Sequence, residues 1–434
     1  MITAAESAAL RARGGDRRRG RAGALLLGLI VAMAPLAAAR AEDPPAPMPD
    51  CVDGKHSNDA ADFRICMPPE GRWNNDLVVY AHGYVSPFEP VGIPESQLVL
   101  GGVSLPKLIT DLGFAFATTG YSGNGLVIPE AVEDVVDLVD VFTNGSDVTP
   151  PRMPRRVYLV GPSEGGAVTA FAIEKHGDVF DGGIAACGPI GSFRAQVGYF
   201  GDFRVLFDVF FPGVLPGSPV DIPLELVANW ETVYVPAITQ AVAADPDAAA
   251  QLLRVSSAPS DAADPSTVLQ TIIDVLWYNV FATNDATVRL GGQPYDNRFR
   301  WYFGSDDDVT LNQTVQRIKA DPAALAKLAS TYETSGRPAS PLVLMHTTGD
   351  PVIRYWNQPL YLLKTIGTGF RDRVLRLPIL RYGHCHFTAP EALIAFGLLL
   401  LKVEGSQLAN AEQALPTPQS RAEYRALQAT LDTR

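Results

Sequence analysis

The sequence predicts an α/β fold: a mostly parallel sheet with helices on both faces and a mainly helical insertion late in the chain. Three observations support this. Short apolar runs alternate with helix-length runs up to about residue 190. The alternation stops over residues 191–338, and two further apolar runs, 341–346 and 374–380, then restore it. We therefore expect a sheet domain at 42–190 plus 340–405, a helical cap at 191–339 and a C-terminal tail at 406–434.

The N-terminus has the pattern of an export signal. Six arginines lie between Arg11 and Arg21, an apolar run fills 22–39, and Ala39-Arg40-Ala41 fits a small-x-small cleavage site. We predict a secretory signal peptide at 1–41 and a secreted or periplasmic protein, with no stable membrane insertion after cleavage. The alternative is a membrane anchor, because the apolar run approaches the roughly 20 residues that span a bilayer.

The charge balance argues against one class of partner. The chain has a formal net charge of −12 at pH 7. The predicted leader holds seven of the arginines and two acidic residues, so cleavage would make the charge more negative. An acidic protein is a poor candidate for binding nucleic acid or anionic membranes.

Four cysteines follow the leader. An even number in an exported chain predicts two disulfides. Cys51 and Cys66 enclose a short polar segment and are expected to pair, which leaves Cys187 with Cys385. The metal alternative lacks support, because the chain has no Cys-x-x-Cys and no close Cys/His cluster of zinc spacing.

The first half of the sequence predicts alternating strands and helices. After the 51–66 loop, apolar runs predict strands and longer periodic runs predict helices. The expected strands are 76–81, 113–119, 157–160 and 182–187, and the expected helices are 105–112, 128–142 and 167–175.

The stretch Gly161-Pro162-Ser163-Glu164-Gly165 lies between a predicted strand and a predicted helix. Strand, sharp turn and helix are the context in which Gly-x-Ser-x-Gly exposes a serine hydroxyl as a nucleophile. The glycines remove side chains that would collide with the neighbouring strand and helix. The alternative is an ordinary Gly/Ser turn.

Two backbone N–H groups are candidates for stabilising a developing oxyanion. Glu164 offers one at the start of the helix. The strand at 76–81 ends in His82-Gly83-Tyr84, and the loop after such a strand supplies the second donor in many serine hydrolases. We expect Tyr84 in that role, with Gly83 as the next candidate.

The predicted cap is rich in aromatic residues and has helical runs at 246–255, 268–281 and 309–318. Most of the aromatic side chains are expected to form the cap's own core, and some to line a cleft over Ser163. Asp306, Asp307 and Asp308 resemble a calcium-type acid run but fit a helix N-terminus better.

A serine nucleophile needs a base and a carboxylate that orients the base. Asp350 and His384 each lie in a loop after a predicted strand, and the carboxyl ends of parallel strands share one edge of a sheet. Asp350 is preferred over Glu391 and Asp306–Asp308, and His384 is preferred over His386 because Gly383 precedes it.

The remaining histidines are assigned no chemistry. We expect structural roles for His176, at the end of a helical run, and His346, at the end of a strand. His56 lies in the predicted Cys51–Cys66 loop and is expected to face solvent.

Together these motifs resemble the α/β-hydrolase-fold serine hydrolases of the exported bacterial kind. The resemblance rests on His82-Gly83, Gly161–Gly166, Gly349-Asp350-Pro351-Val352 and Gly383–Phe387, and covers about 60–190 and 340–402. It implies Ser163 as nucleophile, Asp350 as acid, a histidine after the last strand as base, ester hydrolysis and no cofactor. The ending His384-Cys385-x-Phe387 also resembles tannases and feruloyl esterases, and more distantly the fold resembles prolyl oligopeptidases.

The sequence therefore predicts an exported serine hydrolase acting on a small-molecule or polymer-derived carboxylic ester. One alternative is a peptidase on the same fold, in which Glu225, Glu231 or Asp306–Asp308 would hold a substrate amine. The other is a non-catalytic binding protein, although all three triad members are present.

Overall fold

The fold is built on one eight-stranded sheet. A computed structural model of the chain describes residues 51–56 and 61–432; the predicted signal peptide lies outside the described residues. The sheet has the strand order β1-β2-β6-β3-β7-β8-β9-β10. Its strands are β1 (Cys51–Lys55), β2 (Asp62–Cys66), β3 (Asp76–Tyr80), β6 (Ala115–Thr119), β7 (Arg156–Pro162), β8 (Gly182–Ala186), β9 (Leu342–Gly349) and β10 (Val374–Tyr382).

The direction of the strands defines the fold. From β6 to β10 every neighbouring pair is parallel, whereas β1 pairs with β2, and β2 with β6, in antiparallel fashion. This order, with a strand-turn-helix serine after β7, is the α/β-hydrolase fold. β4 (Val99–Leu100) and β5 (Val103–Ser104) form a separate two-stranded sheet.

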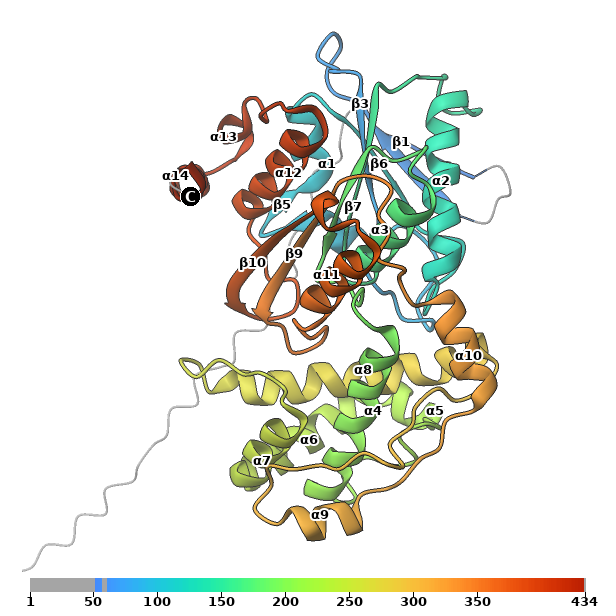
Figure 1. Cartoon of the computed structure of the whole chain (residues 1–434), viewed down its shortest axis with the longest axis vertical. Coiled ribbons are helices and arrows are strands. Elements are labelled where there is room, and N and C mark those ends of the chain that lie inside the picture. The colour runs from blue at the N-terminus through green and yellow to red at the C-terminus, as the bar shows by residue number, and fades with distance from the viewer. Residues whose placement is uncertain (1–50, 57–60, 433–434) are drawn as a thin grey trace, which may run out of the picture. The chain divides into compact units, whose positions relative to one another are not determined.

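Helices cover both faces of the large sheet (Figure 1). Alternate residues of each strand point to opposite faces, so Leu77 and Val79 enter one apolar cluster and Val78 the other. On the first face lie α2 (Ile128–Asn144), α3 (Glu164–Lys175) and α11 (Asn357–Thr368); on the second lie α1 (Leu105–Asp111) and α12 (Ala389–Glu404). The sheet is therefore buried on both sides, as its apolar strands predict.

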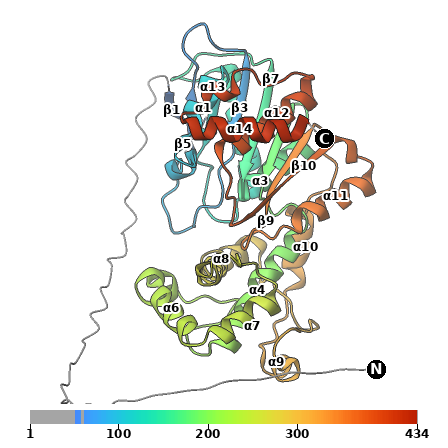
Figure 2. The ribbon, with the colours of Figure 1, turned by 90° about the vertical axis from the view of Figure 1, so that its left-hand side faces the viewer.

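The helical insertion has an apolar core of its own. Buried residues from Tyr199 to Ile318 form one cluster that is separate from the two clusters on the sheet. Its helices are α4 (Phe193–Phe210), α5 (Leu224–Ala228), α6 (Val235–Ala244), α7 (Pro246–Ser256), α8 (Ser266–Leu290) and α9 (Asp308–Thr314), with a π-helical turn at Trp230–Tyr234. In both ribbon views these helices lie together beyond one edge of the sheet (Figures 1 and 2).

The last helix before β9 packs against the cap helices α4 and α8 and also reaches the apolar cluster of the sheet. α10 (Pro322–Thr331) lies within the predicted cap at 191–339. Its buried Ala324 and Leu328, and the following Tyr332, pack in the same cluster as α2 and α3. The part of the insertion with its own core therefore ends near residue 318.

The segment around Cys51–Cys66 differs from the expected loop. It contains β1 and β2, which pair along their whole length and extend the sheet. The prediction that His56 faces solvent is wrong: the residue is 2% exposed, and its Nε2 lies 2.9 Å from Thr119 Oγ1. Its Nδ1 contacts a carboxylate oxygen of Asp137 on α2. The polar sequence around His56 predicts exposure, but hydrogen bonds to Thr119 and Asp137 stabilise the imidazole in a buried position.

One helical prediction needs adjustment. The helix expected at 309–318 ends at Thr314, before Val315 turns to an extended conformation. The tail contains α13 (Ala411–Ala414) and α14 (Pro418–Asp432), and Leu415 and Tyr424 pack against α12. Over the described residues, every helix is too short or too polar to cross a membrane.

Candidate active site

The predicted nucleophile lies on a tight turn between β7 and α3. Ser163 has φ 55° and ψ −122°, a strained conformation for a residue with a side chain. The residue two positions further on must be glycine, since a Cβ on Gly165 would lie 2.0 Å from the carbonyl oxygen of Ala81. Ser163 N–H donates to Ala186 O on β8 at 2.9 Å, which fixes the turn against the next strand.

Three side chains predicted from sequence meet beside this turn. His384 Nε2 lies 2.9 Å from Ser163 Oγ, and His384 Nδ1 lies 2.8 Å from Asp350 Oδ2. The loops after β7, β9 and β10 supply the three residues, as expected for one edge of a parallel sheet. The geometry makes Asp350 the partner that orients the ring and leaves Nε2 to accept the serine proton.

Asp350 is a fully buried carboxylate held by several donors. Its Oδ1 accepts backbone N–H bonds from Val352 and Ile353, each at 2.9 Å. Burial raises the pKa of Asp350, but the charge on His384 and hydrogen bonds from His346 and His384 outweigh it, so the pKa falls below its usual value. The acid is therefore ionised at neutral pH.

His346 also contacts the loop that carries Asp350, in addition to its structural place in β9. Its Nε2 donates to Ile353 O at 2.8 Å and lies 3.5 Å from Asp350 Oδ2. The carboxylate thus lies between two imidazoles, which sequence reasoning did not anticipate. The signal was the spacing of four residues between His346 and Asp350 across a strand end.

The rival acids and the rival base have other partners. Glu391 forms a capping box with Thr388 and a two-bond ion pair with Arg381. Asp307 caps α9, which agrees with the expected helix N-terminus. His386 is packed against Gly383, where φ is +108° and an added Cβ would lie 2.3 Å from His386 Nδ1.

The two expected oxyanion donors, Tyr84 N–H and Glu164 N–H, have no hydrogen-bond partner among the described residues. Glu164 is the first residue of α3, where the helix dipole favours negative charge. The second candidate in the His-Gly loop, Gly83, is not available. Its N–H donates to Gln97 Oε1 at 2.6 Å, an interaction that no local sequence pattern announced.

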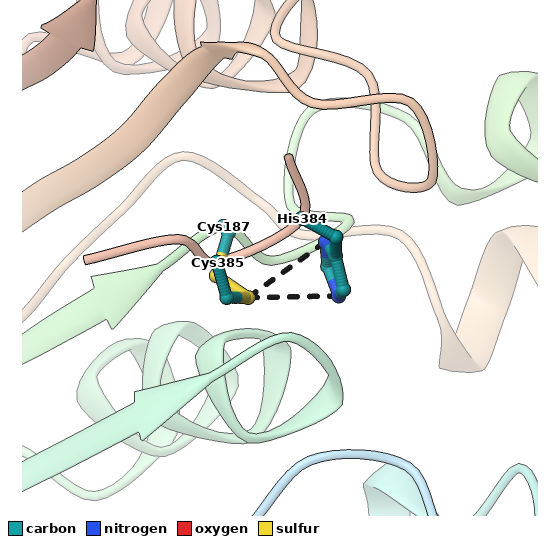
Figure 3. A group of neighbouring side chains, drawn as sticks. All are labelled: Cys187, His384 and Cys385. Carbon is teal, nitrogen blue, oxygen red and sulfur yellow. Dashed lines mark hydrogen bonds between the residues drawn. A yellow bond between two sulfur atoms is a disulfide. The ribbon is translucent and has the colours of Figure 1, made fainter. Parts of the chain in front are cut away.

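A disulfide supports the loop that carries the base. Cys187, directly after β8, is bonded to Cys385, with 5.6 Å between the two Cα atoms; Cys51 and Cys66 form the other disulfide. Cys385 Sγ lies 3.5 Å and 3.7 Å from the two ring nitrogens of His384, so the sulfur packs against the ring (Figure 3). Among the described residues these three form the group with metal-like spacing, but a disulfide offers no thiolate ligands.

A largely apolar cavity opens onto Ser163. Its volume is ≈ 110 Å³. The sheet edge contributes Tyr84, Ser163 and Glu164, and the cap contributes helices α4 and α8. The remaining wall is mostly apolar or small, and includes Leu126, Ile128, Pro189, Phe193, Val197, Phe200, Pro219, Val220, Ala282 and Ala286.

Tyr278 of α8 is a cap residue that lies beside the nucleophile. Its ring stacks on Phe200 at 5.3 Å and meets the His384 ring edge-on at 6.4 Å. Burial raises the pKa of its hydroxyl, which also contacts Ser163. No sequence pattern distinguishes this tyrosine from the cap's other aromatic residues.

Glu164 lines the cavity, and its side chain is buried. It is 6% exposed, and Oε1 accepts Val127 N–H at 3.2 Å. Burial, partly opposed by that hydrogen bond, raises the pKa of the carboxyl to about 8. The group beside the nucleophile is therefore mostly a neutral acid at pH 7.

Solved structures similar to this chain are remote in sequence. Feruloyl esterase B from Aspergillus oryzae has 14% identity and a TM-score of 0.43, over 80% of this chain and 79% of that one. Candida antarctica lipase A has 14% identity and a TM-score of 0.40, over 85% and 78%. Pyrococcus horikoshii acylaminoacyl peptidase has 10% identity and a TM-score of 0.40, over 83% and 43%.

The chain thus spans less than half the length of the acylaminoacyl peptidase structures it matches. A scan against models of protein families finds no match, and no curated protein matches. No residue role passes from these proteins to this chain, so the site rests on its own geometry.

Proposed function

We propose that this protein is an exported serine hydrolase that cleaves carboxylic esters through an acyl-enzyme. One observation carries the proposal: the hydrogen-bonded series Ser163–His384–Asp350 ends at a hydroxyl that faces a cavity able to hold an apolar acyl or alkyl group.

In the first half-reaction, His384 Nε2 takes the proton of Ser163 as the oxygen attacks the ester carbonyl. The N–H groups of Tyr84 and Glu164 stabilise the resulting oxyanion. The tetrahedral intermediate collapses when His384 returns its proton to the leaving alcohol oxygen, and the acyl group remains on Ser163. Asp350 stays ionised and holds the imidazolium.

In the second half-reaction, water enters where the alcohol left. His384 takes a proton from this water, the water oxygen attacks the acyl carbonyl, and the same two N–H groups hold the oxyanion. Collapse returns the proton to Ser163 Oγ and releases the carboxylic acid. No group beyond the chain's own residues is required.

The cavity wall supports ester over amide substrates with a free amine. Glu225, Glu231 and Asp306–Asp308, the acids considered for holding an amine, are absent from the wall. The acid that does line it, Glu164, is mostly uncharged at pH 7. A protonated amine would therefore find little fixed negative charge there.

Two disulfides support the expectation of an oxidising compartment, secreted or periplasmic. The complete Ser–His–Asp arrangement weighs against a binding protein, which would not need an activated hydroxyl.

Labelling with a fluorophosphonate tests the proposal. The protein should be labelled, and Ser163→Ala should not. A panel of 4-nitrophenyl esters and aminoacyl 4-nitroanilides then compares kcat/KM for ester and amide cleavage. Absence of labelling would overturn the proposed function, and faster cleavage of the anilides would replace the esterase with a peptidase.

A further inference from the structure

One buried polar atom of the cavity has no partner. Glu164 Oε2 is shielded from solvent and makes no hydrogen bond within the described part of the chain. Leaving such an atom unpaired costs about 1–3 kcal/mol, so a buried orphan next to a nucleophile calls for an explanation. The orphan belongs to Glu164, a residue that lines the cavity over Ser163.

The other polar side chains of the wall are engaged elsewhere. Gln196 Nε2 donates to Val352 O at 2.8 Å, and its Oε1 accepts from Asn357. Asn279 donates to Pro219 O, and Tyr295 donates to Asp202. Among the lining residues that the structure describes, Glu164 alone has an unpartnered, fully buried side-chain nitrogen or oxygen.

The two oxygens of this carboxyl have different roles. Oε1 accepts Val127 N–H, so the proton of the neutral acid resides on Oε2. An O–H in this position can donate a strong hydrogen bond to an acceptor atom of a ligand. A ligand N–H or ammonium is itself a donor and would be unfavourable beside it.

The surroundings favour the protonated form. Burial is the main cause that raises the pKa of Glu164 to about 8; Asp285 and Glu130 raise it further, while the Val127 N–H and Arg289 lower it. Arg289 is already paired with Asp285 at 2.9 Å. The titratable and charged groups facing Glu164 from all packed elements are Tyr84, Tyr121, Glu130, Tyr278, Asp285, Arg289 and Tyr332.

We propose that Glu164, as a neutral acid, donates a hydrogen bond from Oε2 to an oxygen of the substrate portion held in the cavity. The preferred substrates are then esters with an ether, hydroxyl or carbonyl oxygen in an otherwise apolar chain. This inference rests on the proposed ester hydrolysis and names its substrate class. Glu164 has two separate tasks: its backbone N–H serves the oxyanion, and its side chain selects the substrate.

The test compares isosteric substrates. One arm uses 4-nitrophenyl hexanoate and its analogues in which oxygen replaces a single chain methylene at each position in turn. The other arm places the oxygen in the alcohol, in acetate esters followed by pH-stat. The two arms identify the side of the ester that occupies the cavity. Intrinsic reactivity differs between analogues but cancels when the same ratio is compared between protein variants.

The wild type should prefer one oxygen-bearing ester over its carbon isostere by on the order of tenfold in kcat/KM, the value of one good hydrogen bond. Glu164→Leu should abolish that preference. Glu164→Gln, whose amide can still donate, should keep most of it. Glu231→Gln, a change of an exposed cap acid outside the cavity, should leave the ratio unaltered.

A pH series on the wild type tests the same point without any variant that could misfold. The raised pKa means that Glu164 loses its proton as pH rises through about 8. The preference should therefore be present below pH 8 and fade above it, and it should not change with pH in Glu164→Gln.

Three results would overturn the inference while the esterase stands: an equal ratio in Glu164→Leu and wild type, a wild-type preference unaffected by pH 6–10, or a preference for amine-bearing over oxygen-bearing esters. Fluorophosphonate labelling of each variant shows separately whether Ser163 is still activated. If the wild type is neither labelled nor active on any ester, the proposed function fails and this inference fails with it.

Discussion

The edge of the sheet and the helical insertion both build the site, but they do so in different ways. The sheet edge supplies reactive groups at positions that the backbone dictates, because Ser163, Asp350 and His384 each follow a parallel strand. The insertion supplies wall and contacts that depend on side-chain packing, as in Tyr278 stacked on Phe200. The positions of the reactive groups thus follow from strand order, whereas the cavity wall depends on a separately packed core.

The two regions are nevertheless joined at the acid. Two side chains of α4 reach the loop that holds Asp350: Tyr199 donates to Pro351 O at 2.7 Å, and Gln196 donates to Val352 O at 2.8 Å. The insertion therefore also stabilises the loop that carries Asp350, so substitutions in α4 can shift Asp350 indirectly. Variants that separate the two regions test this comparison.

The largest effect is expected at the nucleophile. Ser163→Ala removes the attacking oxygen and should lower kcat by on the order of 10⁶, as for triads that act as a unit. Steady-state ester hydrolysis measures it, with circular dichroism to verify folding. A variant with more than a few per cent of wild-type activity would place the chemistry elsewhere.

The acid should come next. Asp350→Asn keeps the shape but stabilises the wrong His384 tautomer, so kcat should fall by about 10⁴. Because His346 also approaches this carboxylate, His346→Gln serves as a comparison and should cost much less. Similar losses for both variants would mean that the second histidine takes part in orienting the acid.

The two disulfides offer a matched pair. Each double Cys→Ser variant should lower the free energy of unfolding by about 2–5 kcal/mol. Loss of Cys187–Cys385 should also reduce turnover, because it frees the loop of His384; loss of Cys51–Cys66 on the sheet edge should not. Denaturant titration and kcat are the two measurements. Equal activity loss in both would assign the effect to general destabilisation.

The smallest effect is expected from the cap. Tyr278→Phe removes a hydroxyl that contacts Ser163 and should reduce kcat/KM by about tenfold, the value of one hydrogen bond. Tyr234→Phe is the control, since that cap hydroxyl faces Glu225 instead of the cavity. No loss in Tyr278→Phe would confine the cap to the role of a wall.

The sequence was informative about one of these regions and nearly silent about the other. Gly161 and Gly165 predict the turn at Ser163, and the apolar runs that predict strands put Asp350 and His384 at the same edge of the sheet. Nothing local reveals that Tyr278 rather than Trp277 contacts the serine, because this depends on how α8 is rotated against α4.

The same limit explains the errors. The His-Gly pattern makes Gly83 a candidate donor, but its N–H donates to Gln97, 14 residues later. The polar neighbours of His56 predict an exposed residue, yet its partners Thr119 and Asp137 lie far along the chain. The burial of the Glu164 side chain cannot be read from its neighbours, because it depends on Val127, 37 residues earlier.

The distance along the chain between nucleophile and base has a consequence in time. Ser163 and His384 are 221 residues apart, and β9 and β10, whose following loops carry Asp350 and His384, are the last strands to be made. At 5–20 residues per second, the serine leaves the ribosome on the order of 10–40 s before its base exists. Throughout that interval Ser163 has neither His384 nor Asp350 beside it, so the hydrogen-bonded series can form only after the final strand is made.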